Sequence, residues 1–133
     1  MSRRRAPKWL TRRTLDVIHD AQLREHGGTP GVRDSGLLDS ALARPQNKWD
    51  YGDSSDLATL AAAYTFGLAK NHGYVDGNKP VAFMAADVFL GLNGKDIAAS
   101  EEDVASTIGR VAAGRLTETA LAEWFRGNIG PLV

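Results

Sequence analysis

Two apolar segments that flank one short polar loop limit the possible folds of this chain more than any other feature. Asp56 begins the first segment, in which leucine, alanine and tyrosine residues recur at helical spacing as far as about Asn71. The second segment runs from about Asn78 to Leu92 and is apolar on most sides, which is typical of a buried helix. The sequence therefore predicts a central buried helix that follows directly after the loop.

Helix-capping residues precede the other apolar segments that have helical periodicity. Serine, threonine and aspartate side chains at such positions accept hydrogen bonds from the free N–H groups of the first helical turn. We therefore expect the chain to form one all-α domain around the central helix. The expected caps are Thr11 before residues 12–26, Asp34 before a short helix, Ser100 before residues 101–113 and Thr117 before the last helix.

Proline and polar residues predict where the helices are interrupted. Pro45 lacks a backbone N–H and is expected to stop the helix that Asp34 begins. Residues 46–55 are polar and aromatic, so we expect them to form a connecting loop. The stretch between Gly94 and Ala99 is a short extended piece, and it is too little to predict a sheet.

The size and composition of the chain are typical of a single soluble domain. It has 133 residues, of which 43% are hydrophobic and 24% are charged, and its formal net charge is zero. The absence of cysteine excludes disulfides and thiolate zinc sites and fits a reducing compartment, so we expect a cytoplasmic location. No apolar run approaches the length of a membrane span. Residues 1–9 are expected to form a basic flexible tail, and residues 10–133 the domain.

The loop between the two apolar segments contains the side chains of a phosphate site with a base beside it. His72 is the natural general base, because histidine exchanges a proton readily near neutral pH. Asp76 can hold a divalent ion, and Gly77 can adopt a positive φ. Asn78 and Lys79 can bind phosphate oxygens. Together these residues suit the transfer of a phosphate-containing group to a hydroxyl.

The same residues are also compatible with a purely structural turn. Asp-Gly is an ordinary turn dipeptide, and a single histidine between two helices is usually a surface or capping residue. The other two histidines, His19 and His26, lie on the expected first helix without a metal-type partner. We expect them to be packing or surface residues.

A longer pattern around the loop is specific to one family. The run from His72 to Lys79, HGYVDGNK, resembles the signature of the Fic/Doc superfamily, His-x-Phe-x-Asp/Asn-Gly/Ala-Asn-Lys/Gly-Arg. Fic enzymes typically have glycine at the position of Lys79. In having lysine there, the sequence resembles the Doc (death-on-curing) toxin branch of the superfamily. The segments from Gly27 to Asp34 and from Leu37 to Gln46 also resemble that branch. The likeness covers roughly residues 10–126.

This resemblance implies the helical fold of the family and a toxin of a type II toxin–antitoxin system. Doc toxins are kinases that transfer phosphate from ATP to a threonine of elongation factor Tu, which arrests translation. The resemblance further implies ATP and Mg²⁺ as cofactors and a Phd-type antitoxin that lays its C-terminal segment into a groove beside the active site. Contact with DNA is expected only through the antitoxin. Trp9, Leu10 and the first helix are candidates for the surface that the antitoxin covers.

The signature implies a role for each loop residue. His72 would be the base that takes the proton of the target hydroxyl, and Asp76 would hold Mg²⁺. The segment from Gly77 to Pro80 would bind the nucleotide, with its Asn and Lys side chains at the phosphates. Tyr74, which stands where the family has Phe, would anchor the loop in the core.

Pro80 departs from the signature, in which this position is arginine. Proline cannot offer the fork of charged donors with which arginine binds phosphate, and it also lacks a backbone N–H. We expect an intact fold, because proline is tolerated in the first turn of a helix, but impaired catalysis. An inactivating substitution and a naturally degenerate homologue are both compatible with the sequence.

Two other functions remain open at this point. Many Fic enzymes transfer AMP to a protein hydroxyl, but Lys79 occupies the place of the flexible glycine that helps to seat the transferred phosphate. The other possible function is that of a catalytically inactive module that still binds an antitoxin. Pro80 favours this function more than any other residue does.

Overall fold

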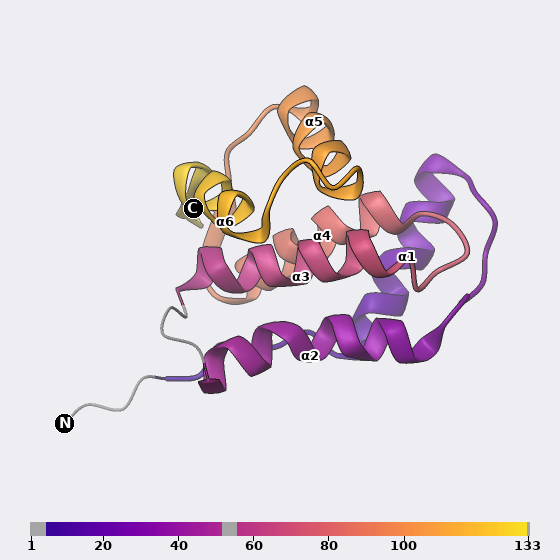
Figure 1. Ribbon diagram of the computed structural model, residues 1–133, viewed down its shortest axis with the longest axis horizontal. Coiled ribbons are helices and arrows are strands. Elements are labelled where there is room, and N and C mark those ends of the chain that lie inside the picture. Colours follow the sequence, from indigo (N-terminus) through magenta and orange to yellow (C-terminus); the bar gives the residue numbers. More distant parts are fainter. Residues whose placement is uncertain (1–4, 52–55, 133) are drawn as a thin grey trace.

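The computed structural model describes residues 5–51 and 56–132 and forms a mostly helical single domain, which confirms the predicted fold class (Figure 1). Within these residues six helices pack together and two short strands pair. The elements in chain order are α1 (Arg12–His26), α2 (Ser35–Tyr51), α3 (Leu57–Asn71), α4 (Asn78–Leu92), β1 (Lys95–Ile97), α5 (Glu101–Ala112), α6 (Glu118–Asn128) and β2 (Ile129–Pro131).

Helix α3 lies at the centre of the domain and packs against α2, α4, α5 and α6 (Figure 1). Most of its residues are buried and many of these are alanine, so neighbouring helices can approach closely. A Cβ atom at Gly67 would lie 3.3 Å from the Cβ of Ala41 on α2. Towards α4, the Thr65 hydroxyl donates a hydrogen bond of 2.8 Å to the carbonyl of Ala82, which satisfies a polar group inside the core.

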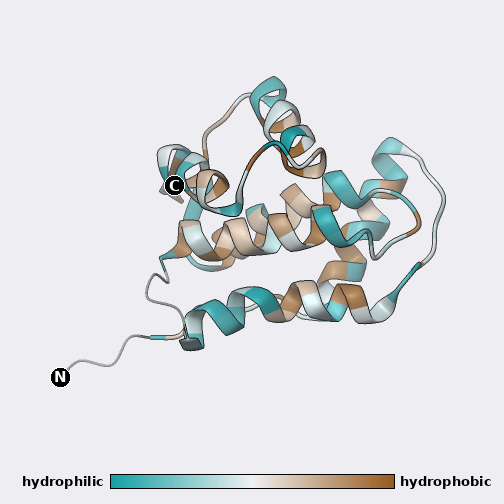
Figure 2. Ribbon diagram, in the orientation of Figure 1, coloured by the Kyte–Doolittle hydropathy of each residue, from teal (hydrophilic) through white to brown (hydrophobic). Residues whose placement is uncertain are grey.

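Helix α4 is buried along one side and more open along the other. Val81, Ala85 and Phe89 belong to the core, whereas Phe83 and Asp87 are half-buried. The predicted buried helix after the loop is therefore present, but α3 is more completely enclosed than α4. Figure 2 shows hydrophobic residues concentrated on these two helices and hydrophilic residues towards the outer turns. No helix in the described ranges is both long and apolar enough to cross a membrane.

Helix α2 continues beyond the point where the sequence predicted its end. Pro45 lies inside the helix, and residues 46–51 are helical, so both the predicted stop at Pro45 and the predicted loop were wrong there. A proline inside a helix costs about 3 kcal/mol, which here is offset by packing. Pro45 is buried, and Trp49 in the following turn contacts Trp9 edge-to-face at 6.4 Å between ring centroids. Residues 52–55 of the predicted loop lie outside the described residues.

The short strands form an antiparallel sheet between two segments far apart in the sequence. β1 pairs with β2, with Lys95 opposite Pro131 and Ile97 opposite Ile129. The expectation that the piece after Gly94 was too little for a sheet was wrong, because its partner is the end of the chain. The pairing holds residues 129–132 beside the end of α4, where the Leu132 N–H donates to the carbonyl of Gly94.

The segment before α1 is packed against the domain from Lys8 onward. The Asn93 side chain accepts from the Lys8 N–H and donates to the Lys8 carbonyl, at 2.9 and 3.0 Å. Trp9 stacks on Phe89, and Leu10 is buried with its N–H bonded to the Tyr64 hydroxyl. Leu10 therefore belongs to the interior and is a poor candidate for a partner surface, while Trp9 is partly buried against the core. Residues 1–4 of the expected tail lie outside the described residues.

Candidate active site

The candidate site begins where α3 ends, at His72. This residue caps the helix in the left-handed conformation, with φ 52°, and its side chain is exposed. That conformation costs a non-glycine residue about 1 kcal/mol or more, so neighbouring groups must hold it. Arg33 does so: its Nε donates to the His72 carbonyl at 2.6 Å and its Nη2 to the Asn71 carbonyl at 2.9 Å.

The connection between α1 and α2 lies antiparallel to the loop between α3 and α4, residues 72–77, and holds it in place. The N–H groups of Arg33 and Asp34 both donate to the Gly73 carbonyl, and the Val75 N–H donates to the Gly31 carbonyl. Gly73 is buried, and a Cβ there would lie 2.4 Å from a methyl carbon of Leu38 on α2. Only a residue without a side chain fits this point of contact.

Asp76 is exposed, and two backbone donors hold its carboxylate. One oxygen accepts from the Thr29 N–H at 3.1 Å and the other from the Gly77 N–H at 2.9 Å. These two hydrogen bonds, the one from Thr29 first, lower the pKa of Asp76, so the carboxylate stays ionised.

The Asp76 carboxylate fits a Mg²⁺ ion that arrives together with a nucleotide. In the described ranges, no group of three or more His, Cys, Asp or Glu side chains could hold a metal ion. Mg²⁺ needs no such protein cage, because it usually keeps several waters and binds one or two carboxylates together with substrate phosphates. Asp76 has lone pairs left for that purpose.

The first turn of α4 completes the loop. Gly77 has the predicted positive φ, at 79°, and opens the turn. The Asn78 amide closes the loop on itself, because its Oδ1 accepts from the Tyr74 N–H and its Nδ2 donates to the Tyr74 carbonyl, at 3.0 and 2.9 Å. Asn78 is therefore a brace for the loop, a role that the sequence did not predict. Lys79 is exposed at the start of the helix.

Pro80 occupies the third position of α4 and does not prevent the helix from forming. The Val81 N–H reaches the Gly77 carbonyl at 3.1 Å, so the hydrogen-bond ladder begins directly after the proline. An N–H at this position would have no intrahelical acceptor in any case. A proline here thus costs the fold little, while it removes one donor from the turn that faces the site.

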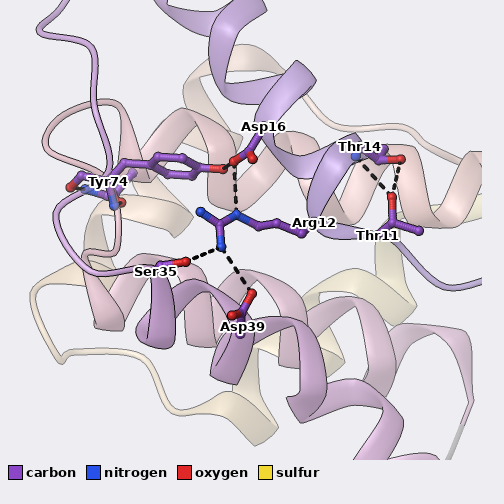
Figure 3. Close-up of polar contacts among 8 residues, drawn as sticks. Thr11, Arg12, Thr14, Asp16, Ser35, Asp39 and Tyr74 are labelled. Carbon is purple, nitrogen blue, oxygen red and sulfur yellow. Dashed lines mark hydrogen bonds and ion pairs between the residues drawn. The ribbon is translucent and has the colours of Figure 1, made fainter.

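Beneath the loop, Tyr74 provides the anchor that the resemblance implied. Its side chain is 1% exposed, its ring stacks on His19 at 3.7 Å between centroids, and its hydroxyl donates to Asp16 at 2.7 Å (Figure 3). Burial, reinforced by the neighbouring Asp16 carboxylate, raises the pKa of Tyr74, so the hydroxyl remains a donor. His19 also bonds to the Asp76 carbonyl through Nε2 at 2.9 Å. The expectation that His19 is a packing residue is confirmed.

A groove of about 630 Å³ reaches the site from one side. It lies between α1, α4, the β1 region and α5, and it meets the loop at Lys79 and Pro80. Its lining combines apolar side chains with several carboxylates. The apolar residues include Phe83, Met84, Ile97, Val104 and Ile108, and the acidic ones are Glu25, Asp87, Asp96 and Glu101.

The predicted site residues therefore lie on the loop between α3 and α4 and in the first turn of α4. His72 begins the loop, Asp76 lies near its end, and Lys79 lies in α4. The groove touches the last of these but neither of the first two. Sequence reasoning missed the residues that support the segment from outside, chiefly Arg33 and Thr29. Arg33 lies within the stretch that resembles Doc proteins, but nothing in a single sequence indicates which carbonyls it contacts.

Comparison with known proteins identifies the family of the chain. The model of the Fic/DOC family matches residues 9–90. "Protein kinase doc" of Escherichia phage P1 is 32% identical over 116 residues, which are 87% of this chain and 91% of that protein. "Toxin Doc" of Mycolicibacterium smegmatis is 51% identical over 75 residues, 55% of this chain and 57% of that one. The chain belongs to the Fic/DOC family, as the signature predicted.

The close contact between Gly73 and Leu38 predicts that Gly73→Ala destabilises the protein. Overpacking of this kind costs about 1–3 kcal/mol, because backbone and side chain must both shift. Gly91→Ala is the matched control, since a Cβ there meets nothing within 4 Å and alanine favours a helix by about 0.5–1 kcal/mol. Thermal unfolding should show a lower Tm for the first variant and an equal or higher Tm for the second. Equal Tm values would contradict the close packing of the loop on α2.

The raised pKa of Asp87, which lines the groove, predicts that Asp87→Asn increases the stability of the protein in a pH-dependent way. Burial, and secondarily the Asp96 carboxylate, raise the pKa of Asp87, so the folded protein holds this proton more tightly than the unfolded chain does. Ionisation therefore lowers stability as the pH rises through the raised pKa. At pH 7 the amide should raise the free energy of unfolding by about 0.5 kcal/mol, since the site is partly exposed. Chemical denaturation at several pH values measures this, and a gain that persists undiminished at about pH 3 would contradict it.

Proposed function

We propose that this chain is a Doc-like toxin that transfers phosphate from ATP to a threonine of elongation factor Tu and thereby arrests translation. The observation that carries the proposal is the strained, exposed His72 held by Arg33, on the same loop as an ionised Asp76. A non-glycine residue kept in a costly backbone conformation is typical of a functional site. Membership of the Fic/DOC family and similarity to a protein named as a kinase support the same reaction.

In the proposed reaction, the threonine oxygen attacks the γ-phosphorus of ATP while the bond to the ADP oxygen breaks. The His72 imidazole takes the hydroxyl proton, which its exposed position allows. Asp76 would hold the Mg²⁺ that neutralises the phosphate charge. Lys79 and the free N–H groups at the start of α4 would bind the phosphate oxygens, helped by the positive end of the helix dipole.

Pro80 is expected to impair this activity without unfolding the protein. The arginine of the signature would supply two parallel charged hydrogen bonds to phosphate, and proline supplies none. Loss of one such contact at the reacting group costs on the order of a hundredfold in rate. The proposed kinase would therefore be slow in its present form.

A Phd-type antitoxin is the proposed partner, and the groove beside Lys79 and Pro80 is its proposed docking site. The groove is apolar along α4 and α5 and carries carboxylates at Glu25, Asp96 and Glu101. A segment with apolar side chains and flanking basic residues would complement both features. A chain that binds the antitoxin but no longer catalyses is the second candidate function, and Pro80 is the observation that favours it.

Restoring the arginine tests the proposed reaction. Pro80→Arg should raise phosphate transfer from ATP to purified elongation factor Tu on the order of a hundredfold, because the lost phosphate contacts return. Pro80→Arg combined with His72→Ala should abolish the gain, and intact-mass measurement of the factor should show added phosphate. Added AMP would identify the enzyme as a nucleotidyl transferase instead. If the folded Pro80→Arg protein modifies nothing, the kinase proposal is contradicted. The antitoxin-binding module without catalysis is then the remaining candidate function.

The docking site is tested by filling the groove. Ala105 on α5 is exposed and lines the groove, so Ala105→Trp should weaken binding of a Phd-type antitoxin C-terminal peptide by more than about tenfold. Ser106→Trp is the matched control, because Ser106 is the next residue on α5, is also exposed and does not line the groove. Calorimetric titration measures both affinities. Equal weakening, or none, would place the peptide elsewhere.

A further inference from the structure

One face of α1 supports the loop of residues 72–77. Arg12, Asp16 and His19 follow one another at spacings of four and three residues, which places their side chains on one side of the helix. Asp16 and His19 each contact the loop directly. Arg12 contacts Asp16 and extends to α2 (Figure 3).

Tyr74 is the point at which the loop meets this face. Its ring lies nearly parallel to the His19 ring, at 7° between planes, and its hydroxyl donates to Oδ1 of Asp16. The tyrosine is thus fixed in two ways, by the stacked ring and by the hydroxyl. A phenylalanine, as in the Fic/Doc signature, would keep the stack and lose the hydroxyl bond. The bond to Asp16 therefore depends on tyrosine at position 74.

Arg12 holds Asp16 in the orientation that receives the hydroxyl. Its Nε donates to the same Oδ1 atom at 3.1 Å, while its Nη1 donates to Ser35 at 2.7 Å and to Asp39 at 3.1 Å (Figure 3). Ser35 and Asp39 both belong to α2. The contacts therefore run without a break from the loop through α1 to α2.

The opposite end of Tyr74 is fixed to the functional part of the loop. Its backbone N–H and carbonyl are both bonded by the Asn78 amide. It stands two residues after His72 and two before Asp76, whose carbonyl is bonded by His19. A shift of the Tyr74 ring would thus move both residues that the proposed reaction uses.

We infer that Asp16 is a positioning residue: through the Tyr74 hydroxyl it sets the orientation of the loop that carries His72 and Asp76, and Arg12 keeps it in place from α2. The ordering of the loop is independent of any reaction. The effect on catalysis rests on the proposed kinase function.

The first test measures amide hydrogen exchange of residues 73–77 in the chain as it stands. Tyr74→Phe and Asp16→Ala should each raise exchange on the order of tenfold, because the loop opens more often without the hydroxyl bond. Asp16→Asn should largely restore protection, since an amide oxygen still accepts the bond.

Two control variants separate positioning from general destabilisation. Tyr64→Phe removes another fully buried hydroxyl, which bonds Leu10 and does not touch the loop. Asp20→Ala removes the next aspartate on α1, which pairs with Arg24. Both should leave exchange of residues 73–77 unchanged. Equal exchange in Tyr64→Phe and Tyr74→Phe, or an unaltered loop in Tyr74→Phe, would overturn the inference.

The second test uses kinetics in the Pro80→Arg background. Tyr74→Phe and Asp16→Ala should lower kcat about tenfold with little change in KM for ATP, since misplacement affects the reacting groups more than nucleotide binding. A rise in KM alone would overturn the catalytic part of the inference. If Pro80→Arg is itself inactive, the proposed function fails, and the exchange measurements still decide whether Asp16 orders the loop.

Discussion

The antiparallel contact between residues 29–34 and the loop of residues 72–77 is the interaction on which the rest of the candidate site depends. It fixes the Gly73 carbonyl, holds His72 in a left-handed conformation through Arg33 and orients the Asp76 carboxylate through Thr29. The loop is too short to hold these conformations alone, and the left-handed conformation of His72 is unfavourable in an isolated chain. The functional groups are thus positioned by a segment some forty residues earlier, and α1 supports the same loop through Tyr74.

Pro80 separates the requirements of the fold from those of the proposed reaction. The third position of a helix needs no backbone N–H for its own hydrogen bonds, so the domain accommodates proline there. Phosphate binding has the opposite requirement, because it depends on donors and positive charge at that turn. A single residue can therefore leave the fold, the loop and the groove intact while it weakens the step that the family signature implies. Lys79 remains as the side-chain cation of the turn.

Local signals in the sequence predicted most of the helices, because capping residues act within one turn. Thr11, Asp34, Ser100 and Thr117 all accept the expected N–H bonds. The failures involve distant partners: the packing around Pro45 that keeps α2 helical, and the chain end that pairs with β1. The site follows the same division. The loop residues and the buried Tyr74 were predictable, whereas the contacts of Arg33 and Asp16, and the bracing role of Asn78, depend on how segments meet in space.

The proposed function requires a complete Doc-like site in which Pro80 limits activity. Protein synthesis in a cell-free translation reaction, with equal amounts of folded protein, measures this. We predict that Pro80→Arg arrests synthesis at a concentration at which the unaltered chain has little effect, while both proteins unfold at similar temperatures. Equal inhibition by the two proteins would show that Pro80 does not limit the site. If the folded arginine variant does not inhibit synthesis, the proposal that the chain is a toxin is contradicted.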